Sequence, residues 1–228
     1  MILTFLKLSN KMKIRLLYII FFMVLFLTSI RSHAQQPSID LTQEQIEQIN
    51  QRISDKLENF LSYLQMMADK KNSQRVRNSA HQRNLNLFIG KCEPYEEFNL
   101  YSHASHIHEA VKMQTSSVNN NKITTQKIKN YFSNLMNNKN YANIKIDQAD
   151  TFYISNIRKT GEDRYEAVAR IKQVFMGMSE NGGVRYGDIT EKAVRIYIER
   201  HTVATPNGYE DVWDIMLGDM KVLSTSRL

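Results

Sequence analysis

The stretch RYEAVARIKQVFMGM at residues 164–178 decides the fold class, because its apolar and polar residues alternate. Alternation places successive side chains on opposite faces of a strand, and one face here carries Tyr165, Ala167, Ala169, Ile171 and Phe175. Asn181-Gly182-Gly183 follows, and glycine supplies the positive φ that a tight hairpin needs. We therefore predict a long strand over 164–178 that turns back on itself through a hairpin.

Three more strands are predicted around this one. Residues 186–202 place Val194, Ile196 and Ile198 on one face, and residues 210–225 do the same with Trp213, Ile215 and Leu217. Upstream, residues 143–158 read as a strand that ends at a polar turn over 159–163. The four segments predict an antiparallel meander, with bends at Gly177 and Gly218.

Helices are predicted before the meander. Thr42-Gln43-Glu44-Gln45 forms a capping box, and apolar residues then recur at steps of three and four, which predicts a helix over 42–70. A second helix over about 74–88 should begin after Asn72-Ser73, turn Val76, Ala80, Leu87 and Phe88 inward, and stop at Gly90.

The middle of the chain is less regular. Residues 91–105 contain Pro94 and clustered polar residues, which indicate a loop, and residues 106–118 alternate like an edge strand. A third helix is expected to be capped by Thr124 or Thr125. Its apolar side comprises Ile128, Tyr131, Phe132, Leu135 and Met136.

Helices first and long strands last indicate an α+β fold, with the helices packed on one face of a curved antiparallel sheet of four to five strands. This order over residues 41–226 resembles the NTF2-like, or cystatin-like, superfamily. The resemblance implies a cone-shaped domain formed by 41–90 and 91–228 together, sometimes with a pocket at its wide end, and it transfers no catalytic residue. The chain also resembles a small exported protein of the Bacteroidetes type.

Residues 1–34 have the three parts of a secretory signal peptide. Basic residues over Lys7–Arg15 precede the apolar run LLYIIFFMVLFLTSI at 16–30, and Ser32-His33-Ala34 places small residues where a signal peptidase reads. The alternative is a retained anchor, although the apolar run is shorter than the roughly 20 residues of a spanning helix. We expect an exported, periplasmic or extracellular protein that meets the membrane only during export.

The net charge of +7 points weakly to nucleic acid, but five of the 30 basic residues lie in the leader. Removing residues 1–34 leaves 25 basic and 23 acidic residues, so no nucleic-acid partner is expected. The single cysteine, Cys92, cannot form an internal disulfide and reads as a buried or incidental thiol. We find no phosphate loop, zinc-ribbon cysteine pair, nucleophile elbow or HExxH helix, and therefore expect no cofactor.

A histidine cluster is the sharpest candidate for metal binding. His103, His106 and His108 lie within six residues, and neutral imidazoles are good ligands for zinc or copper. His81, Glu109 and His201 are possible further ligands. The alternative is a polar loop that runs into a solvent-facing strand, and the same cluster could instead sense acidic pH.

A second candidate is a pocket around Gln173, which interrupts an apolar strand face between Ile171 and Phe175. A buried amide must be hydrogen-bonded, so Gln173 could line a cavity with aromatic walls. The aromatic residues considered are Tyr131, Tyr153, Tyr165, Tyr197 and Trp213. The alternative is ordinary core packing.

Two groups of charged residues are interpreted as solvated surface. The carboxylates Asp188, Glu191, Asp211, Asp214 and Asp219 read as a rim with cross-strand partners rather than as a catalytic pair. The basic residues of segment 70–83 read as a solvated helix face.

Three functions remain open from the sequence. The first is an exported, non-catalytic binding or assembly module that meets a protein partner or a second copy of itself. The second is a small-ligand pocket protein or pocket enzyme. The third keeps residues 16–30 as an anchor and resembles the periplasmic VirB8-type components of secretion channels.

Cleavage of the leader gives the first testable prediction. N-terminal sequencing of protein recovered from the periplasm or medium should read Gln35-Gln36-Pro37, because Ala34 closes the small-residue pattern. Full-length protein found only in the membrane fraction would instead show that residues 16–30 are retained as an anchor.

Overall fold

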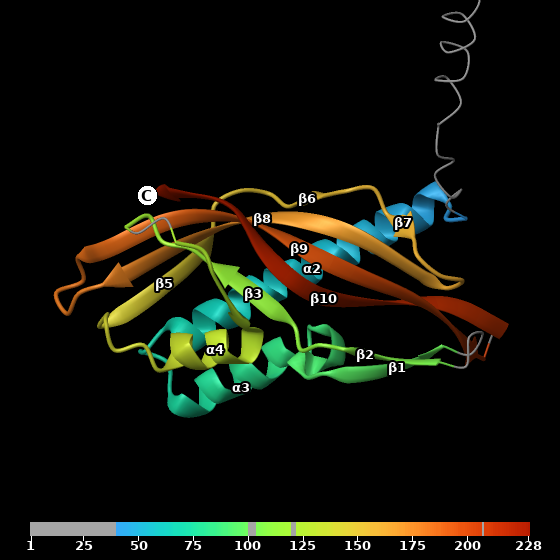
Figure 1. Ribbon diagram of the computed structural model, residues 1–228, viewed down its shortest axis with the longest axis horizontal. Coiled ribbons are helices and arrows are strands. Elements are labelled where there is room, and N and C mark those ends of the chain that lie inside the picture. The colour runs from blue at the N-terminus through green and yellow to red at the C-terminus, as the bar shows by residue number, and fades with distance from the viewer. Residues whose placement is uncertain (1–39, 100–103, 120–121, 207) are drawn as a thin grey trace, which may run out of the picture. The chain divides into compact units, whose positions relative to one another are not determined.

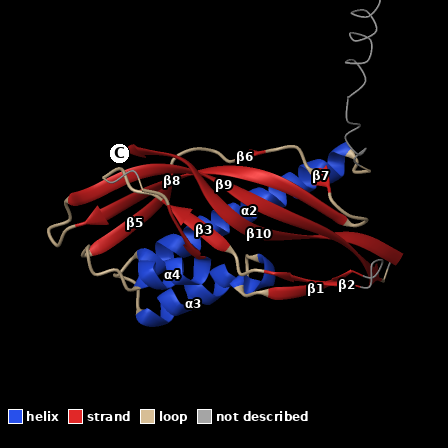
Figure 2. Cartoon of the chain, in the orientation of Figure 1, coloured by secondary structure: helices blue, strands red, loops and turns tan. Residues whose placement is uncertain are grey.

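The computed structural model describes residues 40–99, 104–119, 122–206 and 208–228, without the side chains of 97–99 and 104–106. The predicted signal peptide lies outside this range. Residues 39–228 form one compact unit, in which the helices and a two-stranded hairpin lie on one side of a large sheet (Figure 1). The structure confirms the α+β class and the helices-first order (Figure 2).

Three long strands dominate the sheet and lie where the alternation predicted them. They are β8 (Arg164–Met178), β9 (Val184–Thr205) and β10 (Gly208–Arg227), joined as two antiparallel hairpins. Gly182 has the positive φ, 81°, that the first hairpin turn requires. The sheet has eight strands in the order β4-β3-β10-β9-β8-β5, with β6 and β7 also on β8, so the prediction of four to five strands was wrong.

The single strand predicted over 143–158 is three short ones. These are β5 (Asn143–Gln148), β6 (Tyr153–Ile154) and β7 (Arg158–Lys159), and all of them pair with β8. Asp147 and Asp150 accept hydrogen bonds from the backbone amides of the residues that follow them, each at 2.9 Å. Such local bonds compete with strand pairing, which accounts for the interruption after β5.

The loop predicted over 91–105 was wrong at 95–99 and 104–105, which are strand residues. The strand predicted over 106–118 is confirmed at 106–108 and 112–115 but is interrupted between them. Strands β1 (Tyr95–Asn99) and β2 (Ala104–His108) form a separate hairpin. Strand β3 (Lys112–Thr115) follows buried Ala110 and Val111, and pairs with β4 (Thr124–Lys127) and in parallel with β10. Because 124–127 is a strand, neither threonine caps the next helix, which begins at Ile128.

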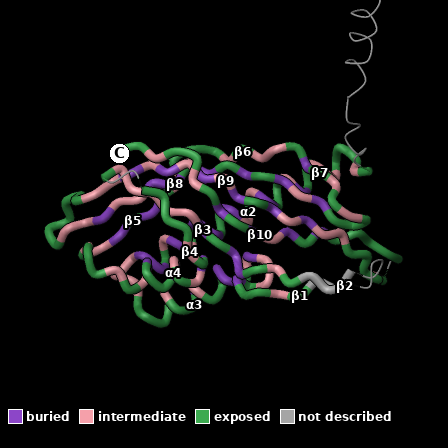
Figure 3. The backbone as a smooth tube through the Cα atoms, viewed as in Figure 1, coloured by how far each residue is buried: buried purple, intermediate pink, exposed green. Residues whose placement is uncertain are grey.

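The first helix matches its prediction closely. Helix α2 (Gln43–Ala68) starts at the Thr42 capping box, with both reciprocal hydrogen bonds formed. Its apolar stripe is buried in the core against the sheet, where α2 packs on β5 and β10 (Figure 3). The fully buried members of the stripe are Ile49, Ile53, Leu57, Phe60, Leu64 and Met67.

The other helices are shorter than predicted. Helix α3 (Gln74–Leu85) is capped by Ser73 but ends before Gly90, and Val76 is 37% exposed rather than inward. Gly90 instead lies inside a short 3-10 turn, η3 (Ile89–Cys92), with φ of 59°. Helix α4 (Ile128–Met136) packs against α2 and α3 and buries Ile128 and Phe132.

The part of β10 that precedes its pairing with β3 is covered by side chains of α2 and by the backbone of Leu87 rather than by a long strand. Arg52 of α2 donates to the Trp213 carbonyl at 2.9 Å, and Lys56 donates to the Ile215 carbonyl. The Leu217 amide donates to the carbonyl of Leu87 at 2.9 Å. These contacts satisfy edge groups that would otherwise recruit another chain, and they fix α2 relative to the sheet.

The basic segment 70–83 also has a structural role. Arg77 donates to the Met67 carbonyl at 2.8 Å and to the Met136 carbonyl, so one guanidinium joins the C-terminal ends of α2 and α4. Lys70 donates to the Tyr141 carbonyl. Cations near helix C-termini are favourable, and these two residues hold the helices in register with the loop before β5.

Bulges at the predicted glycines bend the long strands. Pairing shifts register between Gly177 and Met178 and between Leu217 and Met220. At Gly218 a Cβ atom would lie 2.5 Å from Cε2 of Tyr197 and 3.3 Å from the Arg195 carbonyl oxygen. Glycine is therefore required there by close packing.

The substitution Gly218→Ala should lower the free energy of unfolding by about 1–3 kcal/mol, because the added methyl overpacks this contact. Urea unfolding followed by circular dichroism measures the change. Gly183→Ala is the control, since a Cβ there would meet only side-chain oxygens of the turn, at 3.3 and 3.4 Å. Equal stability of the two variants would contradict the packing explanation.

Candidate functional site

The inward face of β9 changes character halfway along the strand. Val194, Ile196 and Ile198 are fully buried in the core, but the preceding inward positions are Lys192, Thr190 and Asp188. All three are buried, with exposed fractions of 4, 6 and 5%, and Gln173 of β8 pairs with Thr190 and is 3% exposed. Four buried polar side chains thus gather at one end of an otherwise apolar sheet face.

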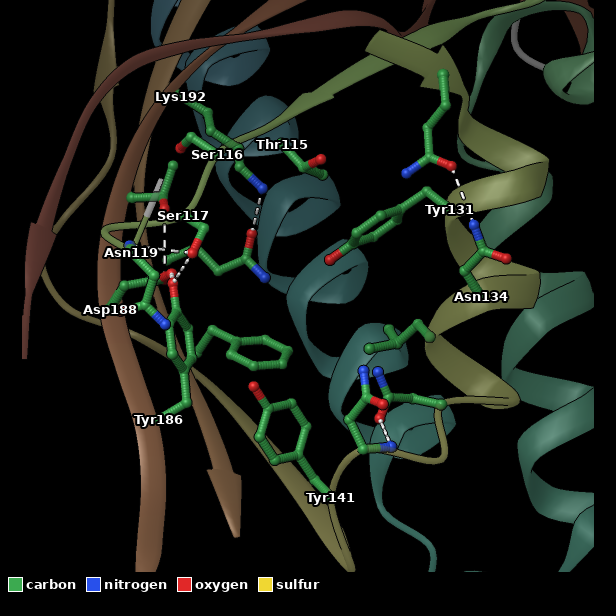
Figure 4. A pocket seen from close by; sticks show the side chains of 17 residues that line it. Thr115, Ser116, Ser117, Asn119, Tyr131, Asn134, Tyr141, Tyr186, Asp188 and Lys192 are labelled. Atoms are coloured by element: carbon green, nitrogen blue, oxygen red, sulfur yellow. Dashed lines mark hydrogen bonds between the residues drawn. The ribbon is translucent and has the colours of Figure 1, made fainter. Parts of the chain in front are cut away.

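These residues line a cavity of about 500 Å³ between the sheet and helix α4. Figure 4 shows Lys192, Asp188 and Tyr186 on the sheet side, with Tyr131 and Asn134 facing them from the helix. The segment after β3 and the loop before β5 complete the walls. The other lining residues used below are Ser117, Tyr141, Gln173, Phe175 and Thr190.

Lys192 is the most unusual group in the cavity. Within the described parts of the chain its Nζ has one hydrogen-bond partner, Oε1 of Gln173 at 2.7 Å, and no carboxylate within 4 Å. Nζ also lies 5.8 Å from the ring centroid of Tyr131. Burial lowers the pKa of the Lys192 ammonium to about 8, and the charge of Asp188 only partly opposes this.

Asp188, in contrast, has its own partners. The Tyr186 hydroxyl donates to Oδ2, and the Thr190 hydroxyl donates to Oδ1 at 3.4 Å. The Tyr186 oxygen also lies 3.0 Å from Oγ of Ser117. Burial raises the pKa of the Asp188 carboxyl while these hydrogen bonds oppose the rise. The carboxylate is therefore hydrogen-bonded to the wall, and it stabilises the Lys192 ammonium by charge attraction rather than by direct contact.

Aromatic rings form the adjoining part of the cavity. Tyr141 and Tyr186 each meet Phe175 with ring centroids 6.0 Å apart, and the two tyrosine rings are 6.4 Å apart. Tyr141 can approach β8 this closely because residue 177 is glycine, where a Cβ atom would lie 2.4 Å from the ring. Burial raises the pKa of the Tyr131 hydroxyl to about 12, so this phenol stays neutral.

Of the six residues suggested for a pocket around Gln173, the structure brings two together. Gln173 and Tyr131 line the same cavity. Tyr153 is 63% exposed, and Tyr165 packs edge-on against Trp213 with ring centroids 5.8 Å apart. Tyr165 and Tyr197 line a different cavity, together with Tyr95.

The interpretation of the carboxylates as a solvated rim was wrong for Asp188. Even-numbered residues of β9 face inward, so Asp188 shares the face of the buried Ile196. Asp211, Asp214 and Asp219 are exposed, as expected of a rim. The missed signal is the alternation of strand faces. Every second residue before Ile196 lies on its face of β9, and these residues include Lys192, Thr190 and Asp188.

The histidine triad remains a prediction. His103 and the side chain of His106 lie outside the described residues, while the His108 ring stacks on Tyr95 at a centroid distance of 4.6 Å. His81 packs edge-on against Phe132, and His201 lies 3.8 Å from Glu199. Among the described residues, no group of three or more His, Cys, Asp or Glu is placed to hold a metal ion.

Cys92 is 1% exposed, and burial raises the pKa of its thiol to about 12. A thiolate is the reactive form of cysteine, so this side chain is inert at neutral pH.

Comparison with known proteins gives no functional information. No protein-family model matches the chain, and no curated protein matches it. Among solved structures, the Kfla4162 protein of Kribbella flavida aligns with a TM-score of 0.30 and 13% identity, over 78% of this chain and 95% of that one. Within the described residues, no helix is both long and apolar enough to cross a membrane.

The buried lysine predicts an unusual pH dependence of stability. Between pH 8 and 10.5 the unfolded chain keeps the Lys192 proton that the folded chain releases, so this residue makes stability rise with pH in that window. Lys192→Met removes the effect. Its stability relative to the wild type should therefore be greatest at pH 7 and fall by about 2–3 kcal/mol toward pH 10.5.

Urea unfolding at pH 7, 8, 9 and 10 measures this difference, and any constant cost of leaving Gln173 unpaired cancels from the slope. Lys172→Met is the control, because Lys172 is exposed and paired with Asp150 at 3.0 Å. Its difference from the wild type should stay constant up to pH 10. A constant difference for Lys192→Met as well would contradict the depressed pKa.

Proposed function

We propose that this chain is an exported, non-catalytic binding module that holds a small polar molecule in the cavity beneath β9. The observation that carries the proposal is the buried ammonium of Lys192, which faces a cavity and whose hydrogen bond is to an uncharged amide. A buried ammonium that no carboxylate contacts directly is costly, and a bound ligand can supply a closer partner than Asp188.

The cavity has the size and lining of a small-molecule site. Its volume of about 500 Å³ falls within the range typical of ligand pockets. Hydroxyl and amide groups of Tyr131, Asn134 and Gln173 converge on it, so a polar ligand could satisfy several hydrogen bonds at once. Strands β3, β4, β8 and β9 and helix α4 contribute to the lining.

The NTF2-like architecture is part of the same proposal. Its support is the order of elements, with α2, α3 and α4 ahead of the β8–β10 meander, and the bulges at Gly177 and Gly218 that bend these strands. The additional strands β3, β4, β6 and β7 would be elaborations of that plan. A cavity between the sheet and a helix is where such a fold would hold a ligand.

A fragment panel tests binding in the cavity. Thermal shifts of the purified protein are measured with a set of small acids, amides, alcohols and amines, each at millimolar concentration. We expect at least one compound to stabilise the wild type and Lys172→Met, and its affinity by titration calorimetry to fall at least tenfold in Lys192→Met.

Tyr131→Ala serves as a second variant, because it changes the opposite wall of the cavity and leaves the lysine in place. Loss of affinity in both cavity variants supports the proposal. Absence of any stabilising compound, or compounds whose affinity neither variant changes, would overturn it.

A further inference from the structure

The cavity combines an ammonium that no carboxylate contacts directly with a wall of edge-to-face and tilted rings. Lys192 and Gln173 mark the polar end, and Tyr141, Phe175 and Tyr186 mark the aromatic end. Because Phe175 follows Gln173 by two residues on β8, both side chains belong to the same region of the sheet face. The polar end and the aromatic end of the cavity are therefore close together. This short separation suits a ligand that contains a single ring.

We infer that the ligand is a small aromatic carboxylic acid, with its carboxylate on Lys192 and its ring against Tyr141, Phe175 and Tyr186. This inference rests on the proposed function and narrows the class of ligand. A ligand carboxylate can accept a charge-assisted hydrogen bond from the ammonium, whose present partner is the neutral Gln173 amide, and such a bond in a buried site is stronger than a neutral one. Flat rings offer edge-to-face contacts that favour an aromatic body over an aliphatic one.

Asp188 is the other charged group in the cavity, and it must not repel such a ligand. Both of its oxygens accept hydrogen bonds from hydroxyl groups, of Tyr186 and Thr190, so the carboxylate is engaged by the wall. The remaining titratable groups of the lining are the phenols of Tyr131, Tyr141 and Tyr186. Burial raises the pKa values of Tyr131 and Tyr186, so both phenols are neutral; Tyr131 can donate to a bound acid, whereas the Tyr186 hydroxyl donates to Asp188.

The Lys192 ammonium also has N–H groups with which it can bind the carboxylate of a ligand. One N–H group of the ammonium donates a hydrogen bond to the Gln173 amide oxygen at 2.7 Å. Two N–H groups are left for a ligand. The Tyr131 ring lies on the other side of the amine, 5.8 Å from Nζ to the ring centroid, and bounds the space that a carboxylate would enter. The site is therefore built for an anion before one arrives.

Titration calorimetry with benzoate and benzamide separates charge recognition from shape, because the two molecules have nearly the same size and ring. We expect benzoate to bind the wild type at least tenfold more tightly than benzamide does. In Lys192→Met that preference should vanish, while Lys172→Met, which alters an exposed lysine outside the cavity, should keep it. Acetate should bind more weakly than benzoate, because it cannot reach the rings.

The outcomes distinguish this inference from the proposed function. Benzamide binding as tightly as benzoate, or equal benzoate binding by Lys192→Met, would overturn carboxylate recognition. Acetate binding as tightly as benzoate would overturn the aromatic part. If neither probe binds but another class in the fragment panel does so in a Lys192-dependent way, the inference fails and the proposed function stands. If nothing binds at all, both fail.

Discussion

The inward row of β9 is the element on which the rest of the structure depends. Its second half, Val194, Ile196 and Ile198, is fully buried in the same core as the apolar stripe of α2. Burying a side chain of this kind stabilises a fold by about 1.5–3 kcal/mol. The core must be large, because Cys92 is the one cysteine in the chain and no internal disulfide can assist it. The side chains of Arg52 and Lys56 donate hydrogen bonds to backbone carbonyls of β10 and so fix α2 along this strand.

The first half of the same row explains why a cavity lies where it does. Once α2 has covered the apolar half, Asp188, Thr190 and Lys192 continue inward with the same pleat and face the cavity. A cavity of about 500 Å³ separates this polar region from helix α4 and from the loop that carries Tyr141. The stability of the apolar half offsets the cost of keeping a lysine buried, so the fold can hold this charge beside the cavity.

The predictable parts of the fold were those with strong local signals. The capping box at Thr42, the three-and-four spacing of α2 and the alternation of β8 to β10 each specify an element without reference to its neighbours. The β1–β2 hairpin depends on which strand lies alongside, and a single sequence does not contain that information. The shift of the third helix to Ile128 has the same origin, because pairing with β3 claims Thr124 and Thr125.

The candidate site was predictable in part. Gln173 was recognisable because it interrupts an apolar face, and Tyr131 lies across the cavity from it. Lys192 and Asp188 were missed because charged residues next to a hairpin normally face solvent, although strand parity placed both on the buried face. Tyr141 lies in a loop, where no period predicts a direction, whereas strand parity places Tyr186 on the same face as Asp188.

The central claim is that Lys192 is a buried amine without a carboxylate partner, and its titration tests this most directly. Carbon-13 NMR of protein carrying labelled lysine, assigned by comparison with the spectrum of Lys192→Met, follows the protonation of this side chain alone. The account predicts one lysine that titrates at about 8 and that is absent from the variant. If every lysine titrates near or above its ordinary pKa of about 10.4, Lys192 is solvated or paired and the site is not as described.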